Sequence, residues 1–91
     1  MKYTFPNFKT HVAALSIVHS QTGIAYRIVE VSDNKITIFR ESTKEMTTIN
    51  TSELYEYYKN AKLYNTSEAK MYISTRAQSP AVAILLALRG K

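Results

Sequence analysis

The sequence predicts an α+β domain in which one helix precedes a three-stranded antiparallel meander and three short helices follow it. Two observations indicate this class. Residues 24–49 alternate apolar and other side chains with the period of two that is typical of strands, and short polar turns separate the runs. Residues 53–90 carry apolar side chains at helical spacing instead. The predicted order is therefore α-β-β-β-α-α-α, with a β-meander at 24–49 and a basic helical subdomain at 53–90.

Length and composition limit the class of protein. The chain has 91 residues, of which 45% are hydrophobic and 21% charged, so we expect one folded domain spanning residues 1–91. The absence of cysteine excludes disulfides and thiolate metal sites. The longest apolar run, at residues 81–88, is too short to cross a bilayer, and no apolar segment follows a basic start. We therefore expect a soluble, cytoplasmic protein with no membrane partner.

Residues 7–20 are predicted to form the first helix, with Asn7 as its N-cap. Apolar residues recur in this stretch at steps of three and four, which places them on one side of a helix. Gly23 lies where a left-handed residue would end such a helix. Several side chains near the end of the stretch are β-branched and suit a strand equally well. Helix and strand therefore both stay open for residues 16–20.

Three strands are predicted at residues 24–32, 35–40 and 46–49. The Asp33-Asn34 pair between the first two is typical of a two-residue hairpin turn, because Asp and Asn tolerate positive φ. Five polar residues separate the second run from the third. Such short connections favour an antiparallel meander. The last strand is short and rich in threonine, so we expect it at an edge of the sheet.

Two N-cap patterns place the starts of the next two helices. Asn50 and Asn65 are each followed three residues later by a glutamate, which is the spacing of a capping box. The first of these helices is expected to run to about Tyr64, with an apolar face toward the sheet. The second is expected to run to about Gln78.

The last helix is predicted to start with Ser79 as N-cap and Pro80 at its first position, and to end at Gly90. Its side chains are apolar nearly all round, so it is either central in its own core or shared with another chain. A domain of this size has few elements to surround it, and two-fold dimers are the commonest oligomers. We therefore predict a homodimer whose interface includes Val82, Leu85 and Leu86.

The sequence contains no pattern typical of a catalytic or metal site. His11 and His19 are eight residues apart, whereas two ligands on one helix need a spacing of three or four. The chain has two glycines and hence no glycine-rich phosphate loop, and no acidic pair has the spacing of an obvious acid–base dyad. We therefore predict a protein that is not an enzyme and has no cofactor, metal or small-molecule substrate.

Charge is distributed unevenly along the chain. Residues 1–56 carry six basic and six acidic side chains, whereas residues 57–91 carry six basic ones and a single acidic one, Glu68, so the whole net charge of +5 lies in the second part. An asymmetric basic surface is typical of proteins that bind nucleic acid. A solvated helical face with a basic tail accounts for the same pattern without a ligand.

The leading hypothesis is a small regulatory or accessory protein that binds nucleic acid, in particular DNA, through a helix-turn-helix-like arrangement. The predicted 66–78 helix presents its polar face to a groove, and the hydroxyl and N–H groups at its start bind a phosphate. A basic and aromatic stripe on the preceding helix flanks it. The alternative is a protein–protein interaction module, namely the homodimer. The residues predicted to bind nucleic acid are Tyr55, Lys59, Lys62, Thr66, Ser67, Lys70, Ser74, Arg76 and Gln78.

Overall fold

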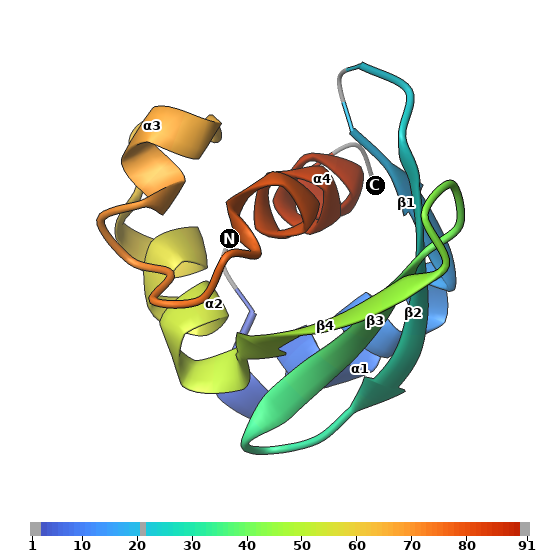
Figure 1. The fold of residues 1–91 in the computed structure, drawn as a ribbon. Helices are drawn as coiled ribbons and strands as arrows, with labels where there is room; N and C mark the ends of the chain where they lie inside the picture. Colours follow the sequence, from blue (N-terminus) through green and yellow to red (C-terminus); the bar gives the residue numbers. More distant parts are fainter. Residues whose placement is uncertain (1–2, 21, 90–91) are drawn as a thin grey trace.

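The computed structural model describes residues 3–20 and 22–89 (Figure 1). Its four strands form one antiparallel sheet in the order β1-β2-β3-β4. The class is α+β, as predicted, but the sheet has four strands instead of three, because residues 17–19, at the end of the predicted first helix, form a strand. The elements are α1 (Phe5–Leu15), β1 (Ile17–His19), β2 (Ala25–Val31), β3 (Lys35–Arg40), β4 (Glu45–Asn50), α2 (Thr51–Asn60), α3 (Thr66–Ala69) and α4 (Gln78–Arg89).

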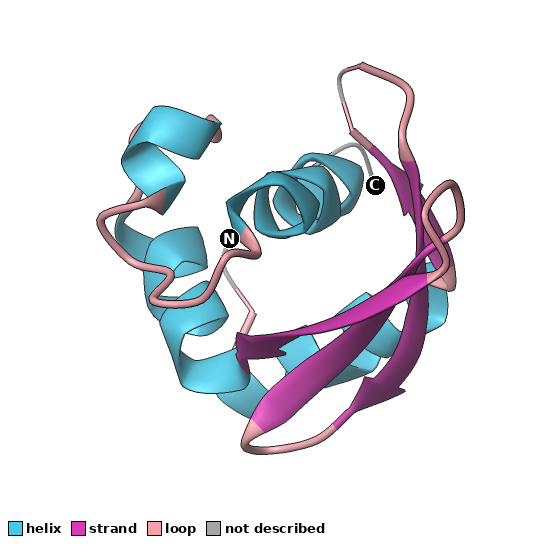
Figure 2. Ribbon diagram, in the orientation of Figure 1, coloured by secondary structure: helices cyan, strands magenta, loops and turns pink. Residues whose placement is uncertain are grey.

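Helices cover one face of the sheet and leave the other uncovered (Figure 2). α4 lies in the centre, with the curved sheet on one side of it and α2 and α3 on the other (Figure 1). α1 packs against both α4 and β2. The covered face supplies the buried side chains of Tyr26, Ile38 and Ile49, whereas Ile17 and Met46 on the opposite face are exposed.

α1 begins and ends earlier than predicted. Thr4, not Asn7, is the N-cap, and its hydroxyl accepts a hydrogen bond from the Asn7 N–H at 3.4 Å. Proline is accommodated in the first turn because that turn needs no N–H from it. Ser16, with φ of +62°, ends the helix. Residues 17–19 then pair with β2, so the strand interpretation is confirmed there and the helix interpretation is wrong.

Gly23 ends no helix and instead shapes the β1–β2 connection. It adopts φ of +90°, which suits glycine, and its N–H donates to the carbonyl of Ser20 at 2.9 Å. The hydroxyl of Ser20 also accepts a hydrogen bond from the Ile24 N–H at 3.1 Å. The turn residue that was assigned to the end of a helix therefore closes a hairpin.

The predicted strands at 24–32, 35–40 and 46–49 correspond to β2, β3 and β4, and β4 lies at an edge. Asp33 and Asn34 form the β2–β3 turn, although neither has positive φ. The turn is closed by Ser32, whose hydroxyl accepts from the Lys35 N–H at 3.2 Å. The fully buried Thr51 then ties it to α2, because its hydroxyl donates to the Ser32 carbonyl at 2.9 Å.

α2 and α3 begin where predicted but end earlier. The side chains of Asn50 and Asn65 accept hydrogen bonds from the N–H groups of Glu53 and Glu68, at 3.0 and 2.8 Å. α2 then stops at Asn60 instead of Tyr64, and α3 is a single turn. The two caps are confirmed and the two helix ends are wrong, for reasons that concern the candidate site.

α4 is buried by its own chain. It begins at Gln78, so Pro80 lies in its first turn rather than opening it. Leu85 and Ile84 are fully buried and Val82 is 5% exposed. The predicted end of the helix, Gly90, lies outside the described residues. Within the described part of the chain, no helix is both long and apolar enough to cross a bilayer.

We expect Leu85→Ala to lower the free energy of unfolding by about 2–5 kcal/mol, because it leaves a cavity beside fully buried neighbours. Leu86→Ala makes the same chemical change one residue along the helix, at a half-buried side chain, and we expect it to cost roughly half as much or less. Urea denaturation of both variants measures the difference. Equal losses would contradict the central position of α4.

Candidate nucleic-acid interface

The predicted recognition helix does not form. α3 ends at Ala69, and residues 70–77 continue as turns and bends. A helix of one turn has no developed dipole, so the exposed hydroxyls of Thr66 and Ser67 are not backed by a helical phosphate site. The helix-turn-helix-like geometry, with a polar helical face at Lys70, Ser74 and Gln78, is therefore wrong.

Side-chain hydrogen bonds explain why the helix stops. The carboxylate of Glu53 accepts from both the N–H and the hydroxyl of Ser74, at 3.1 and 3.0 Å. The hydroxyl of Thr75 donates to the carbonyl of Thr48 on β4 at 3.0 Å. The side-chain amide of Gln78 donates to two carbonyls, at 2.7 and 3.3 Å. These bonds replace those of a helix, so Ser74 and Gln78 hold the segment in place rather than face a ligand.

The stripe predicted on α2 is largely committed to the fold. Tyr55 is half-buried, packs on the rings of Phe5 and Phe8, and its hydroxyl donates to the Tyr3 carbonyl at 2.8 Å. Lys59 lies over the Tyr55 ring, 4.8 Å from its centroid, and also pairs with a neighbouring glutamate on α2 at 3.6 Å. Tyr55 therefore anchors α1 on α2, and Lys59 is already partnered.

The fully buried Tyr57 anchors the loop after α2 through its hydroxyl group. Its hydroxyl accepts from the Asn65 N–H at 3.0 Å and lies 3.0 Å from the Asn65 carbonyl and 3.2 Å from the Leu63 carbonyl. Glu68 holds the same loop, because its carboxylate accepts from the N–H groups of Lys62 and Leu63 at 2.7 and 3.2 Å. These bonds end α2 early and fix the position of Lys62.

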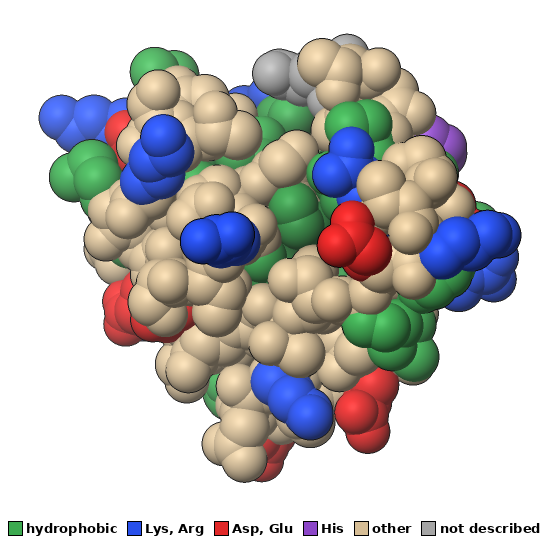
Figure 3. All heavy atoms as spheres, in the orientation of Figure 1, with side chains coloured by type: hydrophobic (Ala, Val, Ile, Leu, Met, Phe, Trp, Pro, Cys, Tyr) green, Lys and Arg blue, Asp and Glu red, His purple; other side chains and the backbone are tan. Residues whose placement is uncertain are grey.

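Three predicted residues remain available to a ligand: Lys62, Lys70 and Arg76. We call them the basic surface. All three are exposed, and within residues 3–20 and 22–89 none of them forms an ion pair. Figure 3 shows basic side chains over α3 and the segment leading to α4, separated from one another by uncharged atoms, and further basic side chains elsewhere on the same face. The acidic residue nearest in sequence, Glu68, accepts hydrogen bonds from backbone N–H groups and forms no ion pair with these three cations.

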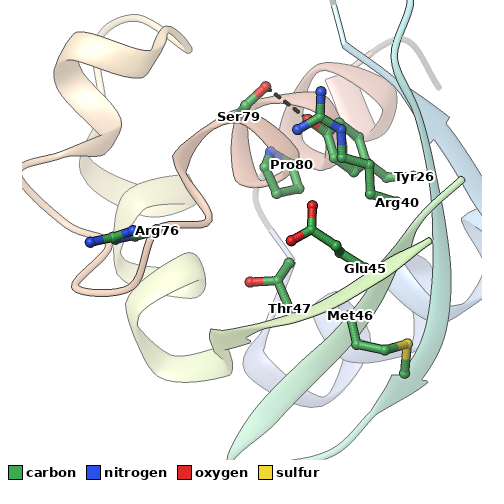
Figure 4. Close-up of a pocket in the computed structure, with 8 residues that line it drawn as sticks. All are labelled: Tyr26, Arg40, Glu45, Met46, Thr47, Arg76, Ser79 and Pro80. Carbon is green, nitrogen blue, oxygen red and sulfur yellow. Dashed lines mark hydrogen bonds between the residues drawn. The ribbon is translucent and has the colours of Figure 1, made fainter. Parts of the chain in front are cut away.

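A cleft of about 490 Å³ lies beside the basic surface, between β4 and the start of α4. In the face drawn in Figure 3, it corresponds to a hollow with apolar side chains at its floor and charged ones at its rim. Figure 4 shows the guanidinium of Arg40 and the carboxylate of Glu45 both directed toward the start of α4, while Arg76 points away from them. The cleft is lined by Tyr26, Arg40, Glu45, Met46, Thr47, Arg76, Ser79 and Pro80.

Arg40 is the unusual member of the cleft. Its Nε is buried without a hydrogen-bond partner, the one such side-chain nitrogen or oxygen in the described part of the chain. An unsatisfied buried donor costs about 1–3 kcal/mol. Glu45 is its direct cross-strand neighbour and still forms no ion pair with it. Neither residue was among the predicted site residues, although a short turn between β3 and β4 places them opposite each other.

The other candidate residues are not assembled into a site. His11 stacks on Tyr3, with ring centroids 4.1 Å apart, and His19 is exposed on β1. Among residues 3–20 and 22–89, no three His, Asp or Glu side chains lie close enough together to hold a metal ion. Val82 and Leu85 of the predicted dimer interface face the core, and only Leu86 is half-buried.

Comparisons with models of protein families, with curated proteins and with solved structures found no match. Function is therefore inferred from the basic surface and the cleft.

Stability is expected to fall at alkaline pH. Burial raises the pKa of Tyr57 above its ordinary value, and burial also raises the pKa of Tyr64. The unfolded chain ionises these phenols near pH 10, so their contribution is complete below about pH 10 and is lost as the pH rises through the folded-state pKa.

Urea denaturation at increasing pH measures this loss. We expect the free energy of unfolding to decline above about pH 10 in the wild type and to decline less steeply in Tyr57→Phe. Tyr3→Phe is the matched control, because it also removes one phenol, the Tyr3 hydroxyl has no hydrogen bond among the described residues, and Tyr3 is not among the groups that raise the pKa of Tyr57. The same steepness in all three proteins would contradict the role of Tyr57.

Proposed function

We propose that this chain binds nucleic acid through the basic surface, with Lys62, Lys70 and Arg76 contacting phosphates. The observation that supports the proposal is that all three cations are exposed without an ion-pair partner, while the acidic residue of the same segment is occupied by the backbone. Solvent-exposed, unpaired cations break no internal ion pair when they contact phosphates, and each phosphate that they neutralise releases condensed counterions from the nucleic acid. No helix of the basic surface is long enough to enter a groove, so the proposed contacts are to the backbone and are independent of base sequence.

The strength of such binding follows from the number of phosphates neutralised. Three contacts to a duplex give a slope of about −2.7 for the logarithm of the association constant against the logarithm of salt concentration. Affinities of this kind lie at Kd values on the order of 10⁻⁴ to 10⁻⁶ M at physiological salt. Binding is therefore expected to be weak, and to strengthen steeply as salt is lowered.

Fluorescence anisotropy of a short labelled oligonucleotide, at several salt concentrations, tests the proposal. We expect Lys62→Gln/Lys70→Gln to weaken binding and to reduce the salt slope by about 2, because each lysine accounts for about one released counterion. Lys35→Gln/Lys44→Gln is the matched control: it removes the same charge from exposed lysines at the start of β3 and in the β3–β4 turn, outside the basic surface.

Two outcomes would count against this function. An equal loss of oligonucleotide affinity in both double variants would mean that binding depends only on net charge and that the basic surface has no special role. No binding of single-stranded or duplex oligonucleotide at low salt would remove the proposal.

A second candidate function is self-association, favoured by the uncovered face of the sheet. Ile17, Arg27, Phe39 and Met46 occupy successive cross-strand positions in one row that crosses all four strands. Ile17 is 44% and Met46 57% exposed. Ile17, Phe39 and Met46 make most of this row apolar, which suits a second copy of the same face, and we propose this face, rather than α4, for any homodimer.

Sedimentation equilibrium tests this candidate. It predicts a dimer whose population rises with concentration and which Met46→Glu converts to monomer, because a carboxylate replaces the most exposed apolar side chain of the row. Leu63→Glu is the matched control, since Leu63 is 62% exposed on the loop after α2, away from the sheet. A wild-type protein that stays monomeric at all concentrations would exclude the dimer.

A further inference from the structure

The cleft holds a positive group that the fold does not use. Arg40 forms no ion pair within the described residues, and its buried Nε lacks a hydrogen-bond partner. Structural arginines at a buried position are ordinarily satisfied by carboxylates, carbonyls or water. The backbone of Arg40 is fixed inside the sheet, because it pairs with Tyr26 on one side and Glu45 on the other. A guanidinium that starts from a fixed strand position and has no internal partner suits a bound oxyanion.

Ser79 adds a neutral donor beside Arg40. The hydroxyl of Tyr26 donates a hydrogen bond to the Ser79 oxygen at 3.2 Å, as the dashed line in Figure 4 shows. Because that oxygen acts as acceptor, its own hydrogen remains free to donate to a ligand. Ser79 also belongs to the first turn of α4, a helix of 12 residues whose positive end favours an anion.

Glu45 introduces the opposite chemistry into the same cleft. Its carboxylate is directed toward the start of α4, as the Arg40 guanidinium is, yet the two form no ion pair (Figure 4). A ligand that was only an anion would be repelled by Glu45. The arrangement therefore suits a ligand that carries an anionic group together with a hydroxyl donor at a short distance from it.

We infer that the cleft binds one ribonucleotide unit: Arg40 binds its phosphate, the Ser79 hydroxyl donates a further hydrogen bond, and Glu45 accepts one from a ribose hydroxyl. The inference rests on the proposed function, because it makes the cleft the place where one unit of a bound strand is held. A volume of about 490 Å³ lies within the range of small-ligand sites. Arg76 belongs to the basic surface and also lines the cleft, so the two are adjacent.

Titration of the full chain, followed by amide chemical shifts, tests the inference. The probes are adenosine 5′-monophosphate, its 2′-deoxy analogue, and a dinucleoside monophosphate whose only phosphate is a diester. We expect shifts at residues 40, 45–47 and 76–79, and weaker binding of the deoxy analogue. Binding of the monoester alone identifies the end of a strand as the ligand, whereas binding of the diester as well identifies an internal position.

Variants assign the roles of the two charges. Arg40→Gln is expected to weaken binding of adenosine 5′-monophosphate by about 10-fold or more, and Arg40→Lys by less, because it keeps the charge and loses the fork of donors. Glu45→Gln is expected to reduce the preference for the ribo over the deoxy probe. Arg27→Gln is the matched control: it removes an arginine that pairs with Glu41 at 2.8 Å on the uncovered face of the sheet.

The outcomes separate this inference from the proposed function. Absence of shifts at these residues with all three probes, or equal affinity in wild type and Arg40→Gln, would overturn the cleft assignment. If the labelled oligonucleotide still binds and responds to Lys62→Gln/Lys70→Gln, the proposed function stands without it. If the oligonucleotide does not bind while the mononucleotide does, the cleft is a nucleotide site and the proposed function fails.

Discussion

The burial of α4 is the constraint on which the other elements depend. A helix that is apolar nearly all round needs partners on every side, and a 91-residue chain must supply them all. The sheet, α1 and α3 each contribute a side. These elements are in turn held by contacts with α2. Tyr55 and Tyr58 of α2 pack on Phe8 of α1 and form hydrogen bonds with Tyr3 before it. Thr51 holds the β2–β3 turn on α2. Most side chains are therefore committed to packing or hydrogen bonds within the fold, and a polar side chain without such a partner is a candidate for binding a ligand.

Local signals in the sequence predicted where elements begin. The caps at Asn50 and Asn65 and the strands β2 to β4 were found because a capping side chain and a period of two act over only a few residues. Where elements end was harder to predict. α2 and α3 stop because Tyr57, Glu68 and Glu53 bind backbone groups five to 21 positions away in the chain. Such partners are visible only after folding.

The sequence predicted the exposed basic residues of the candidate site but not the cleft beside them. Lys62, Lys70 and Arg76 were found from charge asymmetry alone, whereas Lys59 and Tyr55 were already occupied by other side chains. Arg40 belongs to the half of the sequence with no net charge, so no excess pointed to it. Arg40 is a candidate because of its neighbours in the cleft. Glu45 lies opposite it and forms no ion pair with it, and the hydroxyl of Ser79 accepts a hydrogen bond from Tyr26.

The hydrogen bond from Thr75 to the carbonyl of Thr48 has a consequence for behaviour at high concentration. An open edge strand is a template on which another chain can add a strand, and that is a common route to aggregation. Here the segment before α4 occupies a backbone acceptor of the edge strand β4, and the opposite edge strand, β1, has only three residues. Growth of the sheet from molecule to molecule is therefore disfavoured at both ends, without a proline or a bulge in either edge strand.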